Sequence, residues 1–336
     1  MRDARGPQLP SDHGLSATRP GTPDDRPRAG QIRLSDVPVA LIYLAVVAIW
    51  STTPLAVKWS TDPHISFIEG VGIRMGAAAL LTSLLLRLFA IPRRYDREAW
   101  RLYAAGALGF FGAMTQLYWA AQFVPSGLIA LIFGLAPLFA GGLARLILGE
   151  RVLNLPRVLA LLVALAGLAL IFRNEVRLDP GAAPAIATLV VATLFYAMSS
   201  VLVKKYQTRI HPLTQVSGSL WLSCIGFAAV WLLVDGQLPT AVNPRTLAAI
   251  SYLALFGSVL GFMFYFQLLA QLPVATVALI TLMTPPCALI IGWLAAGETL
   301  TARTLIGGGV VMLALAVYQF AAPRSPAQAN NLANRR

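Results

Sequence analysis

Long apolar runs alternate with short polar connections over most of the chain. Ten such runs follow one another, at 37–57, 65–88, 99–121, 125–147, 156–172, 182–203, 213–234, 246–269, 273–295 and 303–321. Each is about the 17–25 residues that an α-helix needs to cross a hydrocarbon core of about 30 Å. The strands of a membrane barrel would be half as long and would alternate polar and apolar positions. The pattern therefore predicts an all-α integral membrane protein with ten transmembrane helices.

Composition removes most other classes of protein. Of the 336 residues, 57% are apolar and 12% are charged, whereas soluble chains carry roughly 25% charged residues. Soluble enzymes, disordered proteins and repeat solenoids are therefore excluded. Cys224 and Cys287 each lie in an apolar run, and there are three histidines. These residues are too few for a disulfide framework or a metal centre, so we expect no metal and no cofactor.

Both ends of the chain are polar. Residues 1–35 are rich in Pro, Gly, Arg, Asp and Ser, so they bury too little apolar surface to offset the entropy of ordering. We predict a disordered cytoplasmic tail there and a second cytoplasmic tail at 322–336. No apolar core of a secretory signal follows the first charges. The connections between the spans are too short for a separate soluble domain, so we expect the function to lie within the bilayer.

The net charge of +12 indicates a topology. With the N-terminus in the cytoplasm, 20 of the 26 Lys and Arg residues fall on the cytoplasmic side, five fall on the opposite side, and Arg74 lies within a span. The positive-inside rule then places both termini in the cytoplasm. Nucleic-acid binding by the basic tail is a weak alternative, since residues 1–35 contain no aromatic side chain.

The two halves of the chain align with each other. Residues 123–150 match residues 271–298 without a gap, and residues 50–58 match residues 196–204. The identities include Pro125 with Pro273, Pro137 with Pro285, and Gly149-Glu150 with Gly297-Glu298. Five spans per half is an odd number, so we predict two inverted five-helix repeats, at 36–173 and 180–321. Inverted repeats are typical of secondary transporters, whose substrates bind near the midplane where the repeats meet.

Several of these features occur together in one known family. They are the ten spans with a second basic loop, the segment WSTTPLAVKW at 50–59, an Arg within the second span, and a Pro followed by Gly-Glu at the ends of the fourth and ninth spans. Over residues 37 to 321 the chain resembles the EamA family of the drug/metabolite transporter superfamily. The resemblance implies export or exchange of small metabolites, often amino acids, through a central cavity. The family is mixed in substrate, so the cargo stays open.

Glu69 and Arg74 are strongly charged residues well inside a span, where charge is costly and usually faces a cavity. They lie about 140° apart on an ideal helix, which is poor geometry for an ion pair. Glu69 shares a face with Gly76, which with Gly72 favours close helix packing. We therefore expect Arg74 to face the cavity, as the resemblance also implies, or else to bond carbonyls at helix breaks. Glu69 is a candidate for proton coupling or for binding a substrate amine, unless it lies at the outer interface.

The first span ends in a polar segment that contains Trp50, Ser51, Thr52 and Pro54. Pro54 cannot donate to the carbonyl of Trp50, so we expect a disturbed helix there, which is typical of binding sites in transporters. The matching positions of the second half hold Tyr196, Ser199 and Ser200. The alternative is that these hydroxyl groups serve helix packing.

Other candidate cavity residues lie deep in later spans, and they are Gln116, Phe133, Tyr265 and Thr281. Aromatic residues nearer the span ends are expected in interfacial belts. Pro137 and Pro285 lie mid-membrane in the fourth and ninth spans. Together with Pro54 they are candidate gating hinges, and the alternative is that each marks a fixed bend.

Two charged pairs are duplicated between the halves. An inverted duplication puts Glu150 and Glu298 on opposite faces of the membrane, so they cannot share one substrate. We interpret them as structural residues that cap helices or anchor loops. Lys58 and Lys204 end equivalent spans, and we interpret them as reaching toward lipid headgroups.

The leading hypothesis is a secondary transporter that exports or exchanges a small metabolite by alternating access through a cavity between the repeats. A helical intramembrane enzyme is one alternative, although the spans offer no metal cluster, Ser/Lys dyad or carboxylate pair. A receptor or scaffold that transports nothing is the other. The chain has no nucleotide-binding loop, so we expect no direct coupling to ATP. Proton antiport and facilitated diffusion both stay open, and protons are a candidate coupling ion. Arginine outnumbers lysine by 23 to 3, which suggests a GC-rich bacterial genome and an inner-membrane location.

Overall fold

The structure is a computed structural model that describes residues 38–60, 65–124, 126–173, 182–234, 236, 243–296 and 301–321. The tails predicted at 1–35 and 322–336 lie outside these residues. Every regular element in the described ranges is a helix. In chain order the elements are α1 (Val39–Ser60), α2 (Phe67–Leu88), α3 (Arg97–Ala107), η2 (Leu108–Ala113), α4 (Met114–Ala120), α5 (Ser126–Phe133), α6 (Ala136–Leu148), α7 (Leu155–Phe172), α8 (Ala182–Lys205), α9 (Pro212–Val234), α10 (Pro244–Tyr252), η3 (Leu253–Leu260), α11 (Gly261–Gln271), α12 (Val274–Ala278), α13 (Ile280–Ala296) and α14 (Ala302–Phe320).

Eight helical segments in the described part of the chain are long and apolar enough to cross a membrane. They are Phe67–Leu88, Leu128–Leu148, Leu155–Phe172, Ala182–Lys205, Pro212–Val234, Pro244–Gln271, Val274–Ile291 and Ala302–Phe320. Val39–Thr53 is a shorter apolar helix. The predicted span 99–121 is helical in α3, η2 and α4, but it is not among the eight. An all-helical membrane architecture is therefore established, and the number of ten spans stays a prediction.

Two of the predicted spans contain a π-helical segment, which the sequence did not predict. One is η2, between α3 and α4, and the other is η3, between α10 and α11. Gly109 in η2 and Gly257 in η3 occupy matching positions of the two halves. A Cβ atom at Gly109 would lie 2.7 Å from the Ser199 hydroxyl oxygen, and one at Gly257 would lie 3.0 Å from a guanidinium nitrogen of Arg74. Both π-helical segments thus carry a glycine that lets a polar side chain approach closely.

The three candidate hinge prolines differ in their surroundings. The fourth span is divided after Phe133, and Pro137 lies in the first turn of α6, where its missing N–H costs little. The ninth span is divided at Leu279 instead, and Pro285 lies inside α13. The disturbance expected at Pro54 is not observed, because α1 is helical from Val39 to Ser60; the Pro54 side chain lies outside the described atoms.

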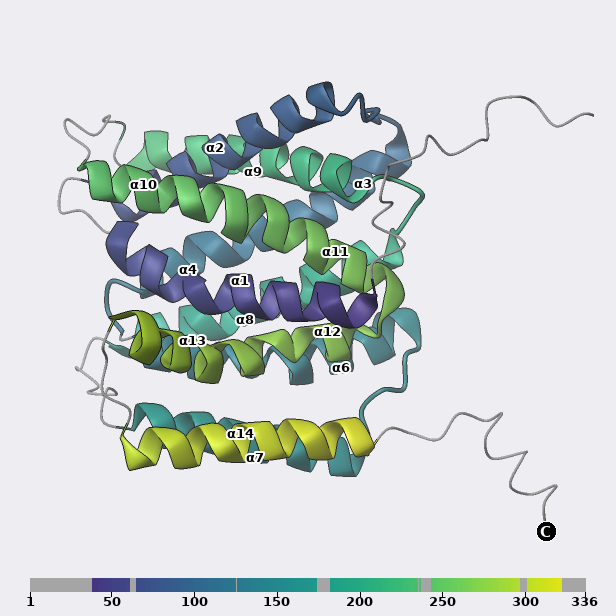
Figure 1. Cartoon of the computed structure of the whole chain (residues 1–336). Coiled ribbons are helices and arrows are strands. Elements are labelled where there is room, and N and C mark those ends of the chain that lie inside the picture. Colours follow the sequence, from purple (N-terminus) through teal and green to yellow (C-terminus); the bar gives the residue numbers. More distant parts are fainter. Residues whose placement is uncertain are drawn as a thin grey trace, which may run out of the picture. The chain divides into compact units, whose positions relative to one another are not determined.

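Helices from the two halves pack against each other in matching pairs. The last helices of the halves, α7 and α14, lie side by side (Figure 1). At their contact, a Cβ atom at Gly167 would lie 2.9 Å from the Gly307 carbonyl oxygen, so two glycines allow this close approach. The second helices of the halves, α2 and α9, also pack on each other.

The first helix of each half, α1 or α8, makes corresponding contacts with helices of the other half. Helix α6 of the first half packs on α8, and α13 of the second half packs on α1. In the same way, α3, η2 and α4 pack on α8, while α10, η3 and α11 pack on α1. Figure 1 shows α1, in purple, between α11 and α13. The first helix of each half is therefore enclosed by helices of the other half.

Candidate functional site

The Arg74 side chain lies in the interior of the described helices, and it is 4% exposed. Its Nε donates to the Ser258 hydroxyl oxygen at 3.0 Å, and its Nη1 donates to the Tyr118 hydroxyl oxygen at 3.0 Å. Ser258 belongs to η3 and Tyr118 to α4, so both halves contribute a partner. Among the described residues, Arg74 forms no ion pair with a carboxylate. A buried guanidinium thus has neutral hydroxyl partners, which do not compensate its charge.

The η3 segment connects Arg74 with the first helix. Trp50 of α1 donates its indole N–H to the Gly257 carbonyl oxygen at 3.3 Å. A Cβ atom at Gly257 would lie 3.0 Å from Arg74 Nη2 and 3.7 Å from the Thr53 hydroxyl oxygen. A larger residue at this position would separate α1, α2 and η3. Gly257 therefore allows Arg74 and Trp50 to share one region of the interior.

From Trp50, a row of aromatic rings crosses the interior. The ring centroids of Trp50 and Tyr265 are 5.2 Å apart, those of Tyr265 and Tyr196 are 5.8 Å apart, and those of Tyr196 and Phe133 are 6.1 Å apart. These four residues come from α1, α11, α8 and α5, and we call them the aromatic row. The Tyr265 hydroxyl group lies 2.8 Å from that of Ser200. Four residues that the sequence singled out are therefore neighbours in space.

Most of the other polar candidates bond to backbone carbonyls. Ser51 donates to Val47 O at 2.6 Å, Thr52 to Ile49 O at 2.7 Å, Gln116 to Gly112 O at 2.8 Å, and Thr281 to Ala278 O at 2.8 Å. Ser199 donates to Ala105 O at 2.7 Å and thereby joins α8 to α3. Thr52 is also 2.6 Å from the Tyr252 hydroxyl oxygen. The first four bonds go to carbonyls three or four positions earlier in the chain, whereas those of Ser199 and of Thr52 with Tyr252 join separate helices. No hydrogen bond among the described residues joins these side chains to Arg74.

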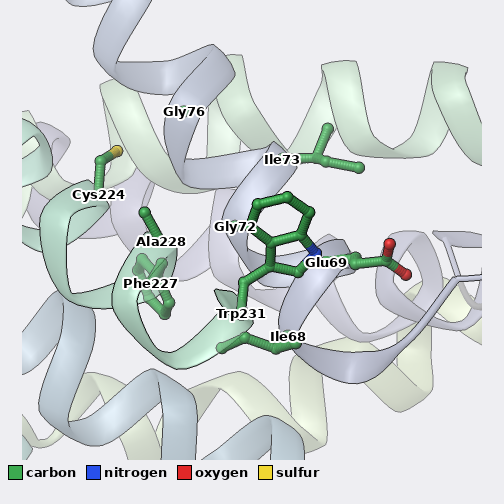
Figure 2. A pocket seen from close by; sticks show the side chains of 9 residues that line it. All are labelled: Ile68, Glu69, Gly72, Ile73, Gly76, Cys224, Phe227, Ala228 and Trp231. Carbon is green, nitrogen blue, oxygen red and sulfur yellow. The ribbon is translucent and has the colours of Figure 1, made fainter. Parts of the chain in front are cut away.

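Glu69 lies in the first turn of α2, nearer the helix end than the sequence suggested. The Glu69 carboxylate accepts from the Ser66 backbone N–H at 2.7 Å, and the Ser66 hydroxyl oxygen accepts from the Glu69 N–H, so the pair forms a capping box. Glu69, Gly72 and Gly76 line a largely apolar pocket of about 260 Å³ between α2 and α9. Figure 2 shows the Glu69 carboxylate at the edge of this pocket, beside the indole ring of Trp231. The carboxylate therefore lies apart from Arg74, whose partners are on η3 and α4.

Glu150 and Lys204 form an ion pair, so the expectation that Lys204 reaches toward headgroups is wrong. Their charged atoms are 3.1 Å apart, and the side chains are 19% and 23% exposed. Lys204 also donates to the Leu272 carbonyl oxygen, and Val274 N donates to Glu150 Oε2 at 3.3 Å. The pair therefore joins α6, α8 and the start of α12. Glu298 and the side chain of Lys58 lie outside the described residues.

Sequence reasoning missed the partners of Arg74. Tyr118 lies near the end of the predicted span 99–121, where aromatic residues are expected in interfacial belts, and Ser258 is not among the sequence candidates. They lie 44 and 184 positions from Arg74 in the chain, so no local pattern connects them. The available signal was the alignment of Gly109 with Gly257, because it marks the two π-helical segments that contact polar side chains.

Comparison with known proteins gives the family. The family model of the EamA-like transporter family matches residues 37–173 and, a second time, residues 183–319. The chain belongs to the EamA-like transporter family. It is therefore a multi-pass membrane protein of a transporter family, and the resemblance drawn from the sequence is confirmed.

Curated relatives of this EamA-like protein are between 23% and 30% identical to it over the aligned residues. The protein PecM of Dickeya dadantii is 30% identical over 66% of this chain and 73% of its own length. A "probable terminal-alkyne amino-acid exporter" of Streptantibioticus cattleyicolor is 25% identical, over 78% of this chain and 90% of that protein. A "probable amino-acid metabolite efflux pump" of Salmonella typhimurium is 23% identical, over 83% and 94%. These relatives support small-molecule transport by this chain.

A solved structure has the same fold. That crystal structure matches 84% of this chain and 97% of its own chain with a TM-score of 0.70, at 18% sequence identity. The agreement supports the fold of the EamA-like protein.

Proposed function

We propose that this protein is a secondary transporter that exports or exchanges an amino acid or a related carboxylate by alternating access. The observation that carries the proposal is the Arg74 guanidinium, which is buried and bonded to two hydroxyl groups. A guanidinium has five N–H donors in a planar fork that matches a carboxylate. A carboxylate beside Arg74 would compensate a charge that its present partners leave uncompensated. Charged residues inside membrane proteins commonly mark substrate pathways.

The aromatic row suits the remainder of such a substrate. Tyr265 is 1% exposed and Tyr196 is 5% exposed, so the rings are buried against each other. Trp50 is the connection, because it contacts both Tyr265 and the Gly257 carbonyl beside Arg74. A small metabolite with its carboxylate at Arg74 would place its side chain toward these rings. Two relatives named for amino-acid or amino-acid metabolite export agree with this substrate class.

The packing of the two halves supports ten spans in two inverted repeats. Each half encloses the first helix of the other, and the π-helical segments η2 and η3 lie at matching places. A two-fold relation between the halves produces such exchanged contacts. Because each half holds five predicted spans, the relation must invert one half in the membrane. We propose both termini in the cytoplasm and a location in the inner membrane, in accord with the basic residues and with the name of a further relative, the "uncharacterized inner membrane transporter YedA" of Escherichia coli.

Alternating access requires a contact that closes one face while the other is open. In the proposed topology, Glu150 and Lys204 lie at the cytoplasmic face, and their ion pair joins the first half to the second. The bonds to Leu272 and Val274 fix the short connection between α11 and α12 to the same pair. We assign this cluster as the closure of the cytoplasmic face. Release or entry of substrate there requires the pair to separate.

Proton coupling is assigned to Glu69. It is 8% exposed and borders a largely apolar pocket, and carboxylates within transmembrane segments often belong to proton relays. Glu69→Gln tests this role cleanly, because glutamine also completes a capping box. The folded yield should stay unchanged, and the dependence of transport on a pH gradient should be lost. Retained pH dependence would remove Glu69 from the mechanism.

The proposal is tested by counterflow in liposomes. Purified protein is reconstituted in vesicles loaded with unlabelled amino acids, and the uptake of labelled amino acids is followed. Accumulation of at least one amino acid above empty vesicles is expected. If folded protein moves none of them, the chain is a receptor or scaffold, or its substrate is of another class.

A further inference from the structure

A second hollow lies at the end of the helices where the chain passes from α2 to α3. It holds about 300 Å³ between the end of α2, the connection 89–96, the start of α3 and the first half of α9. Its lining includes Arg93, Trp100, Thr214, Trp221, Leu222 and Ile225. We call it the α2–α3–α9 pocket. It shares no lining residue with the Arg74 site or with the Glu69 pocket.

The pocket is polar at one end and apolar at the other. Arg93 and Thr214 line the polar end, where α2 and α9 both have an end of a candidate membrane span. Trp221 lies beside Arg93, since both bond to Ser83, and Ile225 lines the apolar end about one turn further along α9; these two α9 side chains are 46% and 68% exposed. Thr214 and Ile225 are separated by about 16 Å along α9, at 1.5 Å per residue. The polarity thus changes along the helix axis in the same direction as from a lipid headgroup to its acyl chain.

The side chains at the polar end leave a positive charge available. Arg94 is held by Asp96 at 2.7 Å and by Glu98 at 3.9 Å. This contact keeps the pKa of the Asp96 carboxyl below its ordinary value, because the Arg94 guanidinium bonds to the charged form. Arg93 makes a long bond to the Ser83 carbonyl oxygen at 3.5 Å and has no acidic partner among the described residues. The segment 93–101 contains four arginines and two acidic residues, so it carries a net positive charge.

The aromatic residues place this end at the level of lipid headgroups. Tyr95 and Trp100 are 65% and 49% exposed. Trp221 donates its indole N–H to the Ser83 hydroxyl oxygen at 2.8 Å, which fixes the ring against α2. Trp and Tyr concentrate at membrane interfaces because one end of each ring is polar and the other is apolar. A cation beside such rings, above an apolar groove, is suited to an anionic headgroup with an attached acyl chain.

We propose that the α2–α3–α9 pocket binds one anionic phospholipid, with its phosphate at Arg93 and an acyl chain along Trp221, Leu222 and Ile225. The phosphate compensates the positive surplus of the 93–101 segment. The site is separate from the substrate pathway, so the proposal stands whether or not the protein exports an amino acid.

Native mass spectrometry of protein released from nanodiscs tests the proposal. Nanodiscs contain phosphatidylglycerol, phosphatidylcholine or an equal mixture, and the number of retained lipids is measured. The wild type should retain one phosphatidylglycerol in preference to phosphatidylcholine. Arg93→Gln should lower that preference about fivefold, because one Arg near a membrane surface contributes about that factor. Arg93→Lys should keep most of it.

Matched variants distinguish binding in this pocket from attraction of anionic lipids by surface charge in general. Arg87→Gln removes an exposed arginine from the last turn of α2 outside the pocket, so any fall in the preference that it causes measures general surface charge, and it should be smaller than the fall in Arg93→Gln. Trp221→Ala should weaken retention of both lipids, because it removes part of the apolar groove. Equal retention in Arg93→Gln and wild type would overturn the proposal. Displacement of the retained lipid by soluble glycerol phosphate would also overturn it, because the site would then recognise a free phosphate.

Discussion

The two most informative cations of this transporter are the buried arginines Arg74 and Arg157, which are 4% and 6% exposed. Arg157 donates to the Tyr318 carbonyl oxygen at 3.2 Å and to the Val152 carbonyl oxygen at 2.8 Å. Its guanidinium carbon also lies 4.5 Å from the centre of the Tyr318 ring. Arg74 donates to two hydroxyl groups and to no carbonyl among the described residues.

The partners determine what each arginine can do. Tyr318 lies in the last turn of α14, where carbonyl groups lack helical partners and the helix dipole attracts a cation. Arg157 is therefore held by fixed backbone acceptors and joins α7 to α14. Hydroxyl groups both donate and accept, and they rotate, so those around Arg74 can bond a ligand instead. Burial alone does not distinguish a structural arginine from a binding one, whereas the identity of the acceptors does.

The largest expected effect is the loss of substrate affinity in Arg74→Gln. Hydrogen bonds to charged groups contribute about 1.5–3 kcal/mol, so affinity for a carboxylate substrate should fall about 10- to 100-fold. Folded yield should change little, because removal of a buried charge that no carboxylate compensates offsets the loss of its two hydrogen bonds. Substrate-dependent quenching of tryptophan fluorescence measures the affinity. An unchanged affinity would make Arg74 a second structural arginine like Arg157.

Arg157→Gln should produce the opposite pattern. Two buried carbonyl groups lose a charged donor, so the free energy of unfolding should fall by about 1–3 kcal/mol. The thermal midpoint in detergent should drop, while the substrate affinity of the protein that stays folded should match wild type. If Arg157→Gln instead lowers affinity at unchanged stability, the distinction between carbonyl and hydroxyl partners does not hold.

Lys204 differs from both arginines in its partners, because it bonds to one carboxylate and to one backbone carbonyl. Lys204→Met should loosen the Glu150 cluster, and amide hydrogen exchange at Val274 should become faster by a factor of about 1.4 to 5. This range reflects the 0.2–1 kcal/mol typical of a partly exposed ion pair. Lys205→Met, one position further along α8, serves as the control. Equal exchange at Val274 in both variants would show that the pair does not hold the α11–α12 connection.

The smallest effect is expected at the exposed pair of Arg94 and Asp96. The pKa of Asp96 is lowered from its ordinary value of 3.8 by the bond from Arg94. Its contribution to stability is present above the unfolded pKa and is lost as the pH falls through the lower folded pKa. Asp96→Asn keeps an N-cap for α3 and should remove that part of the acid dependence of the thermal midpoint. An identical acid profile in the variant would assign the acid loss to other carboxyl groups.

The helices could be predicted from the sequence, because a helix that crosses the bilayer needs an apolar run of about 20 residues. Every predicted span contains helix in the described residues, and the family membership agrees with the duplicated Pro and Gly-Glu blocks. The π-helical segments η2 and η3 were not predictable, since six to eight residues are too few to distinguish their wider period from that of an α-helix. The capping box of Glu69 was readable, because serine three positions before glutamate is a local signal.

The candidate site was predictable only in part. Arg74 could be identified from the sequence, because a charged side chain within an apolar span is costly and usually has a function. Its partners come from distant helices, so no local pattern reveals them. Arg157 was placed with the cytoplasmic segments by the charge count, whereas the structure buries it against the end of α14. The burial of Arg157 depends on packing against a residue 161 positions away, which a single sequence does not reveal.

The most direct test compares an amino acid with the amine that lacks its carboxylate, in counterflow through wild type, Arg74→Gln and Arg157→Gln. Wild type should exchange the amino acid and not the amine. Arg157→Gln should keep this discrimination per folded molecule. Arg74→Gln should lose it through a fall in amino-acid exchange of at least about tenfold. Exchange of the amino acid by Arg74→Gln at the wild-type rate would contradict the assignment of Arg74 to the substrate carboxylate.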